Sequence, residues 1–316
     1  MPLHEHGDRA IAVTALKAAI PYIRMFKRRT FVVKAGGAVF ADDATTRALV
    51  EQLSILHEVG IRVVLVHGGG PQSTALAEAL AVPSEFVQGR RVTDARSLEV
   101  STMVLNGEIN TRILAAARDA GLPAVGMSGV DAGLIRAIKR PPVRVESHGD
   151  VDYGFVGDIR SVNEDVLVRQ LDAGFLPVIS PLSADDQGNL LNINADTVAA
   201  AVAAALKAEK LILATGAAGI LADPTDPGSL VSYLDLQGLE KMLAEKRLAD
   251  GMLPKAAAIE QAIRGGVHRV HVISHDLPDS LLLEVFTNEG TGTLVVESID
   301  SLSPAEQQTQ AGGDVA

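Results

Sequence analysis

A buried strand that ends in glycines constrains this chain more than any other feature of its sequence. Residues 61–76 read IRVVLVHGGGPQSTAL, and the apolar, β-branched run at 63–66 is long enough for a strand and too short for a helix. The run ends at His67 and three glycines, and a helical pattern resumes after Pro71. A strand that leads through glycines into a helix brings backbone N–H groups and the positive end of a helix dipole to one point, which suits an anion.

The same pattern, a strand that ends in glycines, occurs again nearer the start of the chain. Residues 30–37 read TFVVKAGG, a second apolar strand that runs into glycines, with Lys34 at its end; a third such run at 210–214 leads into TGAAG. A single GGG is often only a tight turn, but repetition favours an anion site. Neither GxxxxGKS nor GxxxxGKT occurs, and GxGxxG is absent after the early strands, so the chain has neither a Walker loop nor a dinucleotide fingerprint.

Composition indicates how the core is built. Of 316 residues 47% are apolar but only 3% are aromatic, and there is no tryptophan, so the core must consist of Val, Leu, Ile and Ala. Such a core suits parallel strands covered by helices on both faces, and the early β-loop-α repeats have the form of crossover connections. We therefore expect an α/β fold with a mostly parallel central sheet.

Charge and the residue types that are missing exclude several classes of function. The net charge of −11 argues against nucleic acid as a partner, and no apolar run approaches the ~20 residues that a membrane span requires. The first residues do not have the pattern of a secretory signal, so we expect a cytoplasmic protein. Zero cysteines exclude disulfides and thiolate sites, and no His, Asp or Glu spacing indicates a protein-held metal.

Hydrophobic periodicity places the remaining elements. We expect strands at 30–35, 61–66, 124–127, 176–180, 210–214, 269–273 and 293–297, and helices at 9–28, 43–59, 71–81, 94–105, 109–120, 163–173, 196–206, 235–245, 252–264 and 279–285. Short alternating runs between 133 and 162 predict hairpins, which form either a lid over a substrate or a surface decoration. The polar, Gly/Gln-rich stretch 298–316 is predicted to be disordered.

Six polar residues are candidates for chemistry, and most of them have a plainer alternative. Lys34 at a strand end could hold a phosphate or be a solvated lysine. Asn192, Asn194 and Asp196 meet at one corner, where they could grip a polar substrate or cap the following helix. Lys255 begins a helix, against the preference of the helix dipole, which suggests an anion nearby. Arg91 could clamp a carboxylate, although arginine is more often found at the surface.

The set of motifs resembles that of the amino-acid kinase family, and within it the acetylglutamate kinases of arginine biosynthesis. The resemblance extends from about residue 20 to 297 and is carried, in order, by VVKAGG, LVHGGGPQ, GRRVTD, VGMSG, GFLPVISP, NINADTVAAAVAAAL, DPGSL, DGMLPK and EVFTNEGTGTLV. It implies the fold of that family, a three-layer αβα sandwich with a central mostly parallel sheet and a β-hairpin lid. It also implies transfer of phosphate from ATP, with Mg²⁺ carried by the nucleotide, to the γ-carboxylate of N-acetyl-L-glutamate.

The resemblance also assigns roles. It implies that Lys34 and Lys255 stabilise the transferring phosphoryl group and that Asp196 organises them. The residues implied to bind the acetylated amino acid are Gly69, Gly70, Arg91, Asn192 and Asn194. Those implied to bind the nucleotide are Gly36, Gly37, Thr215, Gly216, Gly219 and Met252.

A regulatory role follows from the same resemblance. In arginine-inhibited members of the family an N-terminal helix interlaces dimers into a hexamer, and 1–29 is similar to that arm. Tyr22, Glu284, Gly290 and Gly292 match the inhibitor site, so arginine is an expected inhibitor and a homo-oligomer, dimer or hexamer, an expected assembly. The implied division is an N-terminal lobe at 30–185 for the amino acid and dimerisation, and a C-terminal lobe at 186–297 for the nucleotide.

Three departures from the family pattern leave alternatives open. The family usually has tyrosine or leucine where Ala35 stands, an aspartate at the place of Gly216, and a lysine at the place of Val130. The loss of the aspartate puts nucleotide contacts in question. The alternatives are a kinase for aspartate, glutamate or a carrier-linked aminoadipate, or a catalytically lapsed protein that binds arginine or a partner.

Overall fold

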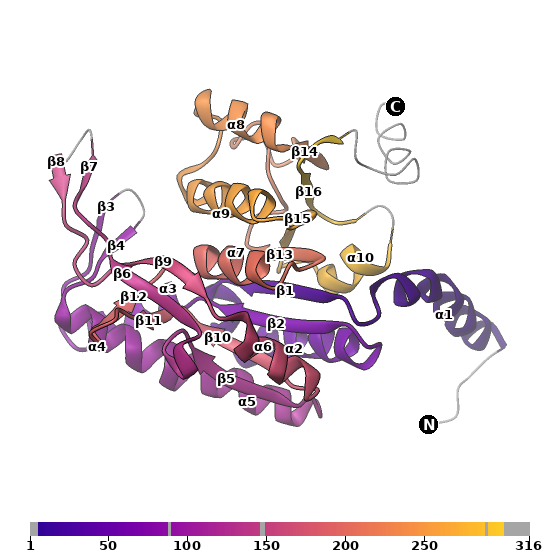
Figure 1. Ribbon diagram of the computed structural model, residues 1–316. Helices are drawn as coiled ribbons and strands as arrows, with labels where there is room; N and C mark the ends of the chain where they lie inside the picture. Colours follow the sequence, from indigo (N-terminus) through magenta and orange to yellow (C-terminus); the bar gives the residue numbers. More distant parts are fainter. Residues whose placement is uncertain (1–5, 88–89, 146–148, 288–289, 300–316) are drawn as a thin grey trace.

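A sheet of eight strands runs through the whole molecule (Figure 1) in this computed structural model, which describes residues 6–87, 90–145, 149–287 and 290–299. Its order is β14 (Tyr233–Asp235), β16 (Thr293–Val296), β15 (Arg269–Ser274), β13 (Lys210–Thr215), β1 (Thr30–Ala35), β2 (Arg62–His67), β10 (Leu176–Ser180) and β5 (Ala124–Ser128). The strands from β15 to β5 are parallel, and β16 is antiparallel to β15. The expectation of a mostly parallel sheet is confirmed.

Helices cover both faces of this sheet, so that each strand buries its side chains in two cores. On β1, Val32 belongs to one core, whereas Phe31 and Val33 belong to the other, as the alternation of side chains along a strand requires. The first core is covered by α6 (Glu164–Asp172), α7 (Ala195–Ala205), α8 (Leu236–Ala244) and α9 (Leu253–Arg264). The second is covered by α2 (Asp43–Glu58), α3 (Gly70–Ala79), α4 (Ala95–Thr102), α5 (Asn110–Asp119) and α10 (Ser280–Phe286).

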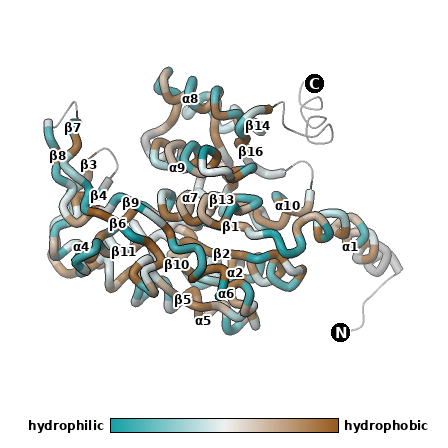
Figure 2. Tube along the Cα trace, in the orientation of Figure 1, coloured by the Kyte–Doolittle hydropathy of each residue, from teal (hydrophilic) through white to brown (hydrophobic). Residues whose placement is uncertain are grey.

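Burial on both faces explains why the central strands are apolar throughout. Every residue of β10 and of β13 is buried, and Figure 2 shows helices in which hydrophilic and hydrophobic residues alternate on both sides of the sheet. Side-chain oxygens cap the first turn of several helices: Asp42 accepts from Thr45 N, Asp94 from Ser97 N and Asp235 from Gly238 N.

One pair of expected helices is joined rather than separate. A π-helical segment, η2 (Met103–Ile109), continues α4 into α5 where the sequence suggested a break before Ile109. Val104, Leu105 and Ile109 are buried there. Tertiary packing therefore keeps the backbone helical despite Gly107, whose intrinsic preference is against a helix.

Smaller sheets stand beside the main one, and some of their strands fall between 133 and 162, where hairpins were expected. A four-stranded sheet has the order β12 (Leu190–Asn192), β11 (Leu182–Ala184), β6 (Ile135–Lys139) and β9 (Gly157–Val162). Two hairpins pair β3 (Glu85–Val87) with β4 (Arg90–Val92), and β7 (Val143–Val145) with β8 (Gly149–Val151). The prediction of hairpins in this region is confirmed, whereas their use as a lid stays a prediction.

The first helix, α1 (His6–Phe26), extends away from the body of the molecule (Figure 1). Phe26 at its end is buried in the second core, but Ile11, Leu16 and Met25 are 68%, 60% and 62% exposed. None of the helices in the described part of the chain has the length and apolar character that a membrane crossing requires. The stretch predicted to be disordered lies outside the described residues from position 300 onward.

The two lobes expected from the sequence share the main sheet. Strand β1 pairs with β2 on one side and with β13 on the other, so the boundary between the expected lobes runs between β1 and β13. Lys34 lies on that boundary, opposite Val66 of β2 and Leu213 of β13. A residue at this place can act on groups bound to either half.

Candidate active site

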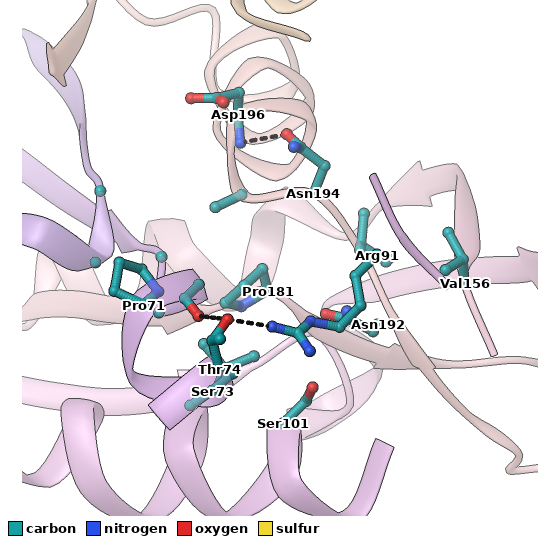
Figure 3. Close-up of a pocket in the computed structure, with 18 of the residues that line it drawn as sticks. Pro71, Ser73, Thr74, Arg91, Ser101, Val156, Pro181, Asn192, Asn194 and Asp196 are labelled. Atoms are coloured by element: carbon teal, nitrogen blue, oxygen red, sulfur yellow. Dashed lines mark hydrogen bonds between the residues drawn. The ribbon is translucent and has the colours of Figure 1, made fainter. Parts of the chain in front are cut away.

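A cavity of about 490 Å³ opens where β1 and β2 end at their glycine turns (Figure 3). Carboxyl ends of parallel strands meet at one edge of a sheet, and helix N-termini begin there, so this is the common place for a ligand. The helices α3 and α7 both start at this edge. The lining residues are Lys34, Gly36, Gly37, Gly68, Gly69, Gly70, Pro71, Ser73, Thr74, Phe86, Arg91, Ser101, Leu105, Arg140, Val156, Pro181, Asn192, Ile193, Asn194, Ala195 and Asp196.

Lys34, Asp196 and Lys255 meet in three dimensions although they are far apart in sequence. Lys34 Nζ lies 2.8 Å from Asp196 Oδ1, and Lys255 Nζ lies 3.7 Å from Asp196 Oδ2. Lys34 points to the same face of β1 as Val32, which α7 covers, and Asp196 lies in the first turn of α7. Helix α9 packs against α7, and both bury mainly alanines, which lets the two helices approach closely and brings Lys255 to Asp196.

The charges of this group leave an excess of one cation. The side chains of Lys34 and Asp196 are 7% and 6% exposed, and that of Lys255 is 19% exposed. Burial lowers the pKa of Lys255, the Asp196 carboxylate acts against that shift, and the Lys34 ammonium adds to it. Two ammonium groups on one carboxylate are the arrangement expected where an additional anion binds.

The first two glycine turns of the sequence contact each other, and this contact explains why glycine is required. A Cβ at Gly37 would lie 2.6 Å from Gln72 Oε1 and 2.9 Å from Gly69 Cα, and a Cβ at Gly69 would lie 2.6 Å from Ile109 Cδ1. A Cβ at Gly70 would meet nothing within 4 Å, so open space and not packing surrounds that position. Gln72 Nε2 joins the two turns by donating to Gly37 O at 2.7 Å.

His67 supports the second turn from behind and does not face the cavity. Its ring is buried, with Nδ1 at 3.2 Å from Gly68 O and Nε2 at 3.2 Å from Asn110 Nδ2, so Nδ1 donates and Nε2 accepts. Burial lowers the pKa of His67 to about 4. His67 is therefore a packed histidine of the core.

Arg91 is the cation at the far end of the cavity. Its Nη1 donates to Ser84 Oγ and its Nη2 to Thr74 Oγ1, both at 2.6 Å, and its guanidinium lies 4.7 Å from the centre of the Phe86 ring. Within the described ranges, no carboxylate lies at ion-pair distance from Arg91, and burial lowers its pKa. Its partners orient the guanidinium without neutralising it, which fits a group that receives a ligand carboxylate.

Asn192 and Asn194 both line the cavity, as expected from their alternation. Asn194 caps α7: its Oδ1 accepts from Asp196 N at 2.9 Å and from Thr197 N at 3.1 Å. The capping prediction is confirmed for Asn194, which leaves only its amide N–H groups for a ligand. Asn192 ends β12 beside Arg91 in Figure 3.

Several lining residues were not expected from the sequence. Phe86 and Val156 supply apolar walls, Ser101 comes from α4, and Arg140 forms an ion pair with Asp158, with Nη2 at 2.5 Å from Oδ1. Val156 and Arg140 lie where hairpins were predicted and Ser101 lies in a predicted helix, whereas Phe86 lies in a segment for which no element was predicted. In the sequence, the one signal that could have pointed to these lining residues was Arg140, a basic residue next to the two prolines after β6.

Four residues expected to bind the nucleotide do not line this cavity. Thr215 ends β13, and its Oγ1 donates to Ala217 O at 3.0 Å. Gly219 is required by packing, since a Cβ there would lie 2.6 Å from Leu230 Cδ1. Gly216 is exposed beside His275, and Met252 begins α9 and packs partly against the first core.

The residues expected for an inhibitor lie on the other side of the molecule, near α1. Helix α1 contacts α10, in which Glu284 is buried. His271 Nδ1 donates to Glu284 Oε1 at 2.5 Å, and Thr291 N donates to Glu284 Oε2 at 2.6 Å. Burial raises the pKa of Glu284, but the hydrogen bond and charge of His271 and the Thr291 N–H outweigh it and bring that pKa to about 2.

Gly290 and Gly292 flank Thr291 in the same region. A Cβ at Gly290 would lie 3.0 Å from Glu284 Oε2, and one at Gly292 would lie 2.0 Å from Val272 O. Tyr22 of α1 packs against the second core. Both glycines therefore allow the chain to approach α10 and β15 closely.

Comparisons with known proteins show what this chain is similar to. The model of a family described as the amino acid kinase family matches residues 29–274. An acetylglutamate kinase from Myxococcus xanthus is 50% identical over 288 residues, which cover 90% of this chain and 94% of that protein. Another, from Symbiobacterium thermophilum, is 45% identical over 282 residues, which cover 89% of this chain and 96% of that protein.

Two solved structures are similar in fold. An N-acetylglutamate synthase from Neisseria gonorrhoeae, complexed with coenzyme A and N-acetyl-glutamate, has a TM-score of 0.79 and 30% identity, and covers 90% of this chain. This chain spans only 63% of that synthase's length. Carbamate kinase from Giardia lamblia bound to AMP-PNP covers 86% of this chain with a TM-score of 0.61 and 16% identity, a similarity of fold alone.

Proposed function

The chain belongs to the amino acid kinase family, and from that premise we propose that it transfers the γ-phosphoryl group of ATP to the γ-carboxylate of N-acetyl-L-glutamate, a step of arginine biosynthesis. A carboxylate oxygen forms a bond to the γ-phosphorus while the bond to the β–γ bridging oxygen breaks. ADP leaves with that electron pair, and the product is N-acetylglutamyl phosphate. The acceptor is already an anion near neutral pH, so the reaction needs no general base.

The meeting of Lys34 and Lys255 on Asp196 is the observation that carries this proposal. The chemical difficulty is to bring two anions together and to stabilise charge on the phosphoryl group during transfer, which positioning and cations achieve. The two lysines come from opposite sides of the β1–β13 boundary, so they can hold a phosphoryl group passing between two bound substrates. Asp196 holds both ammonium groups in place.

The acceptor is assigned to the cavity. Arg91 would take its α-carboxylate, and Asn192, Asn194 and the N–H groups at Gly69 and Gly70 would bind its remaining polar atoms. Phe86 and Val156 give the cavity an apolar wall of the kind that suits an acetyl methyl group.

The nucleotide is assigned to the C-terminal lobe, with its phosphates at Gly36 and Gly37. Thr215, Gly216, Gly219 and Met252 would bind the rest of it. Among the described residues that line the cavity, Asp196 is the only carboxylate, and it is held by two ammonium groups, so the residues present fit a phosphate better than a protein-held metal. Magnesium bound to the nucleotide would neutralise part of the phosphate charge. This use of ATP leads us to assign the enzyme to the cytoplasm, which cell fractionation can test.

A coupled assay of ADP release tests the proposed reaction. N-acetyl-L-glutamate should support turnover well above that with aspartate, with free glutamate or with no acceptor. Faster turnover with a free amino acid would replace this proposal with a related carboxylate kinase. A carrier-linked aminoadipate should be inactive in the same assay.

Gly216 favours one further candidate, a catalytically lapsed protein that binds arginine or a partner. Where the family has an aspartate this chain has an exposed glycine with no side chain, and a Cβ added there would lie 3.6 Å from His275 Nε2. Calorimetry of ATP binding, with and without N-acetylglutamate, separates the two. Absence of ATP binding in both titrations would favour the lapsed protein.

Inhibition by arginine is proposed for the region between α1 and α10. The buried Glu284 carboxylate provides negative charge there, Gly290 lies against that carboxylate, Gly292 lies against β15, and Tyr22 packs against the second core. An arginine titration of activity in the wild type and in Glu284→Gln tests the proposal. Inhibition that is equal in both would assign arginine to another place.

A homo-oligomer, dimer or hexamer, is proposed from α1. Ile11, Val13, Leu16 and Met25 are 68%, 52%, 60% and 62% exposed, an apolar surface that a second copy could cover. Light scattering of the full chain and of a chain that begins at residue 27 tests the role of this helix. A mass that is unchanged by the deletion would place the subunit contacts elsewhere.

A further inference from the structure

The segment Tyr153–Val156, here called the strap, joins two parts of the acceptor site that come from distant parts of the chain. On one side it pairs with Thr93, which follows the strand β4 that carries Arg91. Thr93 N donates to Tyr153 O at 2.9 Å, and Phe155 N donates to Thr93 O at 2.7 Å. The backbone N–H and C=O of Thr93 are therefore both hydrogen-bonded to the strap.

On its other side the strap pairs with the strand that carries the second acceptor group. Asn192 N donates to Phe155 O at 2.8 Å, and Val156 forms a parallel bridge with Asn192. Arg140 N donates to Val156 O at 2.8 Å, which joins a third lining residue to the same segment. Figure 3 shows Arg91, Asn192 and Val156 at the same end of the cavity.

Gly154 is the residue that lets the strap come so close to Thr93. Its φ is +73°, a left-handed conformation that favours glycine, and a Cβ there would lie 2.2 Å from Thr93 O and 2.9 Å from Thr93 C. Both atoms are backbone, so they cannot move aside as a side chain could. Any side chain at position 154 must push the strap and Thr93 apart.

A small hydrophobic cluster fixes the strap to the hairpins. Tyr153 is 3% exposed and packs with Val87 of β3 and Val145 of β7, in a cluster separate from the two large cores. Tyr153 therefore packs against the β3–β4 hairpin, and Gly154 lies against Thr93, directly after that hairpin.

We propose that the strap is the positioning element of the acceptor site: Tyr153 and Gly154 set the placement of Arg91 relative to Asn192 without touching the substrate. This inference rests on the proposed function, because it takes the acceptor to lie between those two residues. The groups that act on the phosphoryl donor, Lys34 and Lys255, are held by Asp196, and within the described ranges no hydrogen bond or ion pair joins either lysine to the strap. A displaced strap should therefore weaken binding of the acceptor and not of ATP.

The test compares Gly154→Ala with Gly121→Ala in steady-state kinetics. Gly121 has a similar φ of +70° but no atom within 4 Å of the added Cβ, so it reproduces the backbone strain without the collision. We expect Gly154→Ala to raise KM for N-acetylglutamate at least about tenfold, with KM for ATP and kcat changed less than about threefold, and Gly121→Ala to match the wild type. Equal changes in both KM values, or the same change in both variants, would overturn the inference.

A second pair keeps the test decisive if Gly154→Ala does not fold. Tyr153→Ala removes the anchor from its cluster without a collision, and Tyr153→Phe keeps the ring that packs there. We expect the alanine variant to show the selective rise in KM for the acceptor and the phenylalanine variant to restore the wild-type value. A wild type that does not phosphorylate N-acetylglutamate would overturn the proposed function and this inference together, whereas an active wild type with unselective variants would overturn this inference alone.

Discussion

Lys34 Nζ and Asp196 Oδ1 lie 2.8 Å apart, in an ion pair whose side chains are almost completely buried. Breaking such a pair is costly because it leaves one buried charge without a partner. Here the carboxylate also holds Lys255 at 3.7 Å, so the group retains a positive charge at the end of β1. That excess charge links the fold of the protein to the chemistry proposed for it.

Removal of either lysine tests this link directly. We expect Lys34→Ala and Lys255→Ala each to lower kcat by about 10²–10³, the usual size of losing one electrostatic donor to a transition state. Lys241→Ala is a matched control, because that exposed lysine pairs with Glu245 on the surface of α8. Wild-type turnover in both active-site variants would contradict the assignment.

The pH dependence of kcat should report the charge of Lys255. Burial lowers its pKa below the usual 10.5 and the Asp196 carboxylate opposes that shift, so activity should fall as pH rises through a pKa below 10.5. In Asp196→Asn the opposing charge is gone, and the fall should move to lower pH. Asp186→Asn, an exposed carboxylate paired with Arg136, should leave the profile unchanged. If kcat fell at the same alkaline pH in Asp196→Asn and in the wild type, the charge of Lys255 would not be what the pH profile reports.

Arg91 should contribute to binding of the acceptor and not to the chemical step. We expect Arg91→Lys to raise KM for N-acetylglutamate by about tenfold or more, since lysine cannot form two parallel hydrogen bonds with a carboxylate. Arg96→Lys, at an exposed site beside Glu99, is the control. A loss confined to kcat would mean that Arg91 acts on the phosphoryl group instead.

His67 should make stability depend on pH in a defined window. Its pKa is about 4 in the folded protein and ordinarily 6.5, so between these values the unfolded chain binds a proton that the folded chain does not. The free energy of unfolding keeps its full value above pH 6.5 and should fall by up to about 3 kcal/mol as pH decreases from 6.5 to 4. Urea unfolding across this range should show a weaker pH dependence in His67→Gln, and an equal dependence would show that another group is responsible.

Two adjacent glycines should respond differently to the same substitution. In Gly69→Ala the added methyl group meets Ile109 and Leu105 at 2.6 and 2.7 Å, so we expect a loss of about 1–3 kcal/mol in unfolding free energy. In Gly70→Ala the methyl group meets nothing within 4 Å, and stability should be close to that of the wild type. Chemical denaturation measures the unfolding free energy of both variants. Equal losses would mean that Ile109 and Leu105 of the π-helical segment move aside for the methyl group added in Gly69→Ala.

The local part of this description was accessible from the sequence. Apolar runs that end in glycines predicted β1 and β2 with their bounds nearly correct, because strand periodicity and turn chemistry depend on neighbouring residues. The same reasoning offered a helix cap as one role for the group Asn192, Asn194 and Asp196, and Asn194 has that role. It predicted a break before Ile109 wrongly, since packing of the π-helical segment outweighed the local preference.

Which residues of the site lie close to one another was decided only by the tertiary structure. The sequence marks Lys34 and Lys255 as unusual, but it contains no distance between them, and their meeting on Asp196 depends on how closely α9 packs against α7. Likewise, nothing local to Tyr153–Val156 distinguishes it from a surface hairpin, and its role is defined by contacts with Thr93 and Asn192 far along the chain. The physical reason is that hydrogen bonding and side-chain periodicity act over a few residues, whereas charge pairing and close approach depend on distances that only the packed chain establishes.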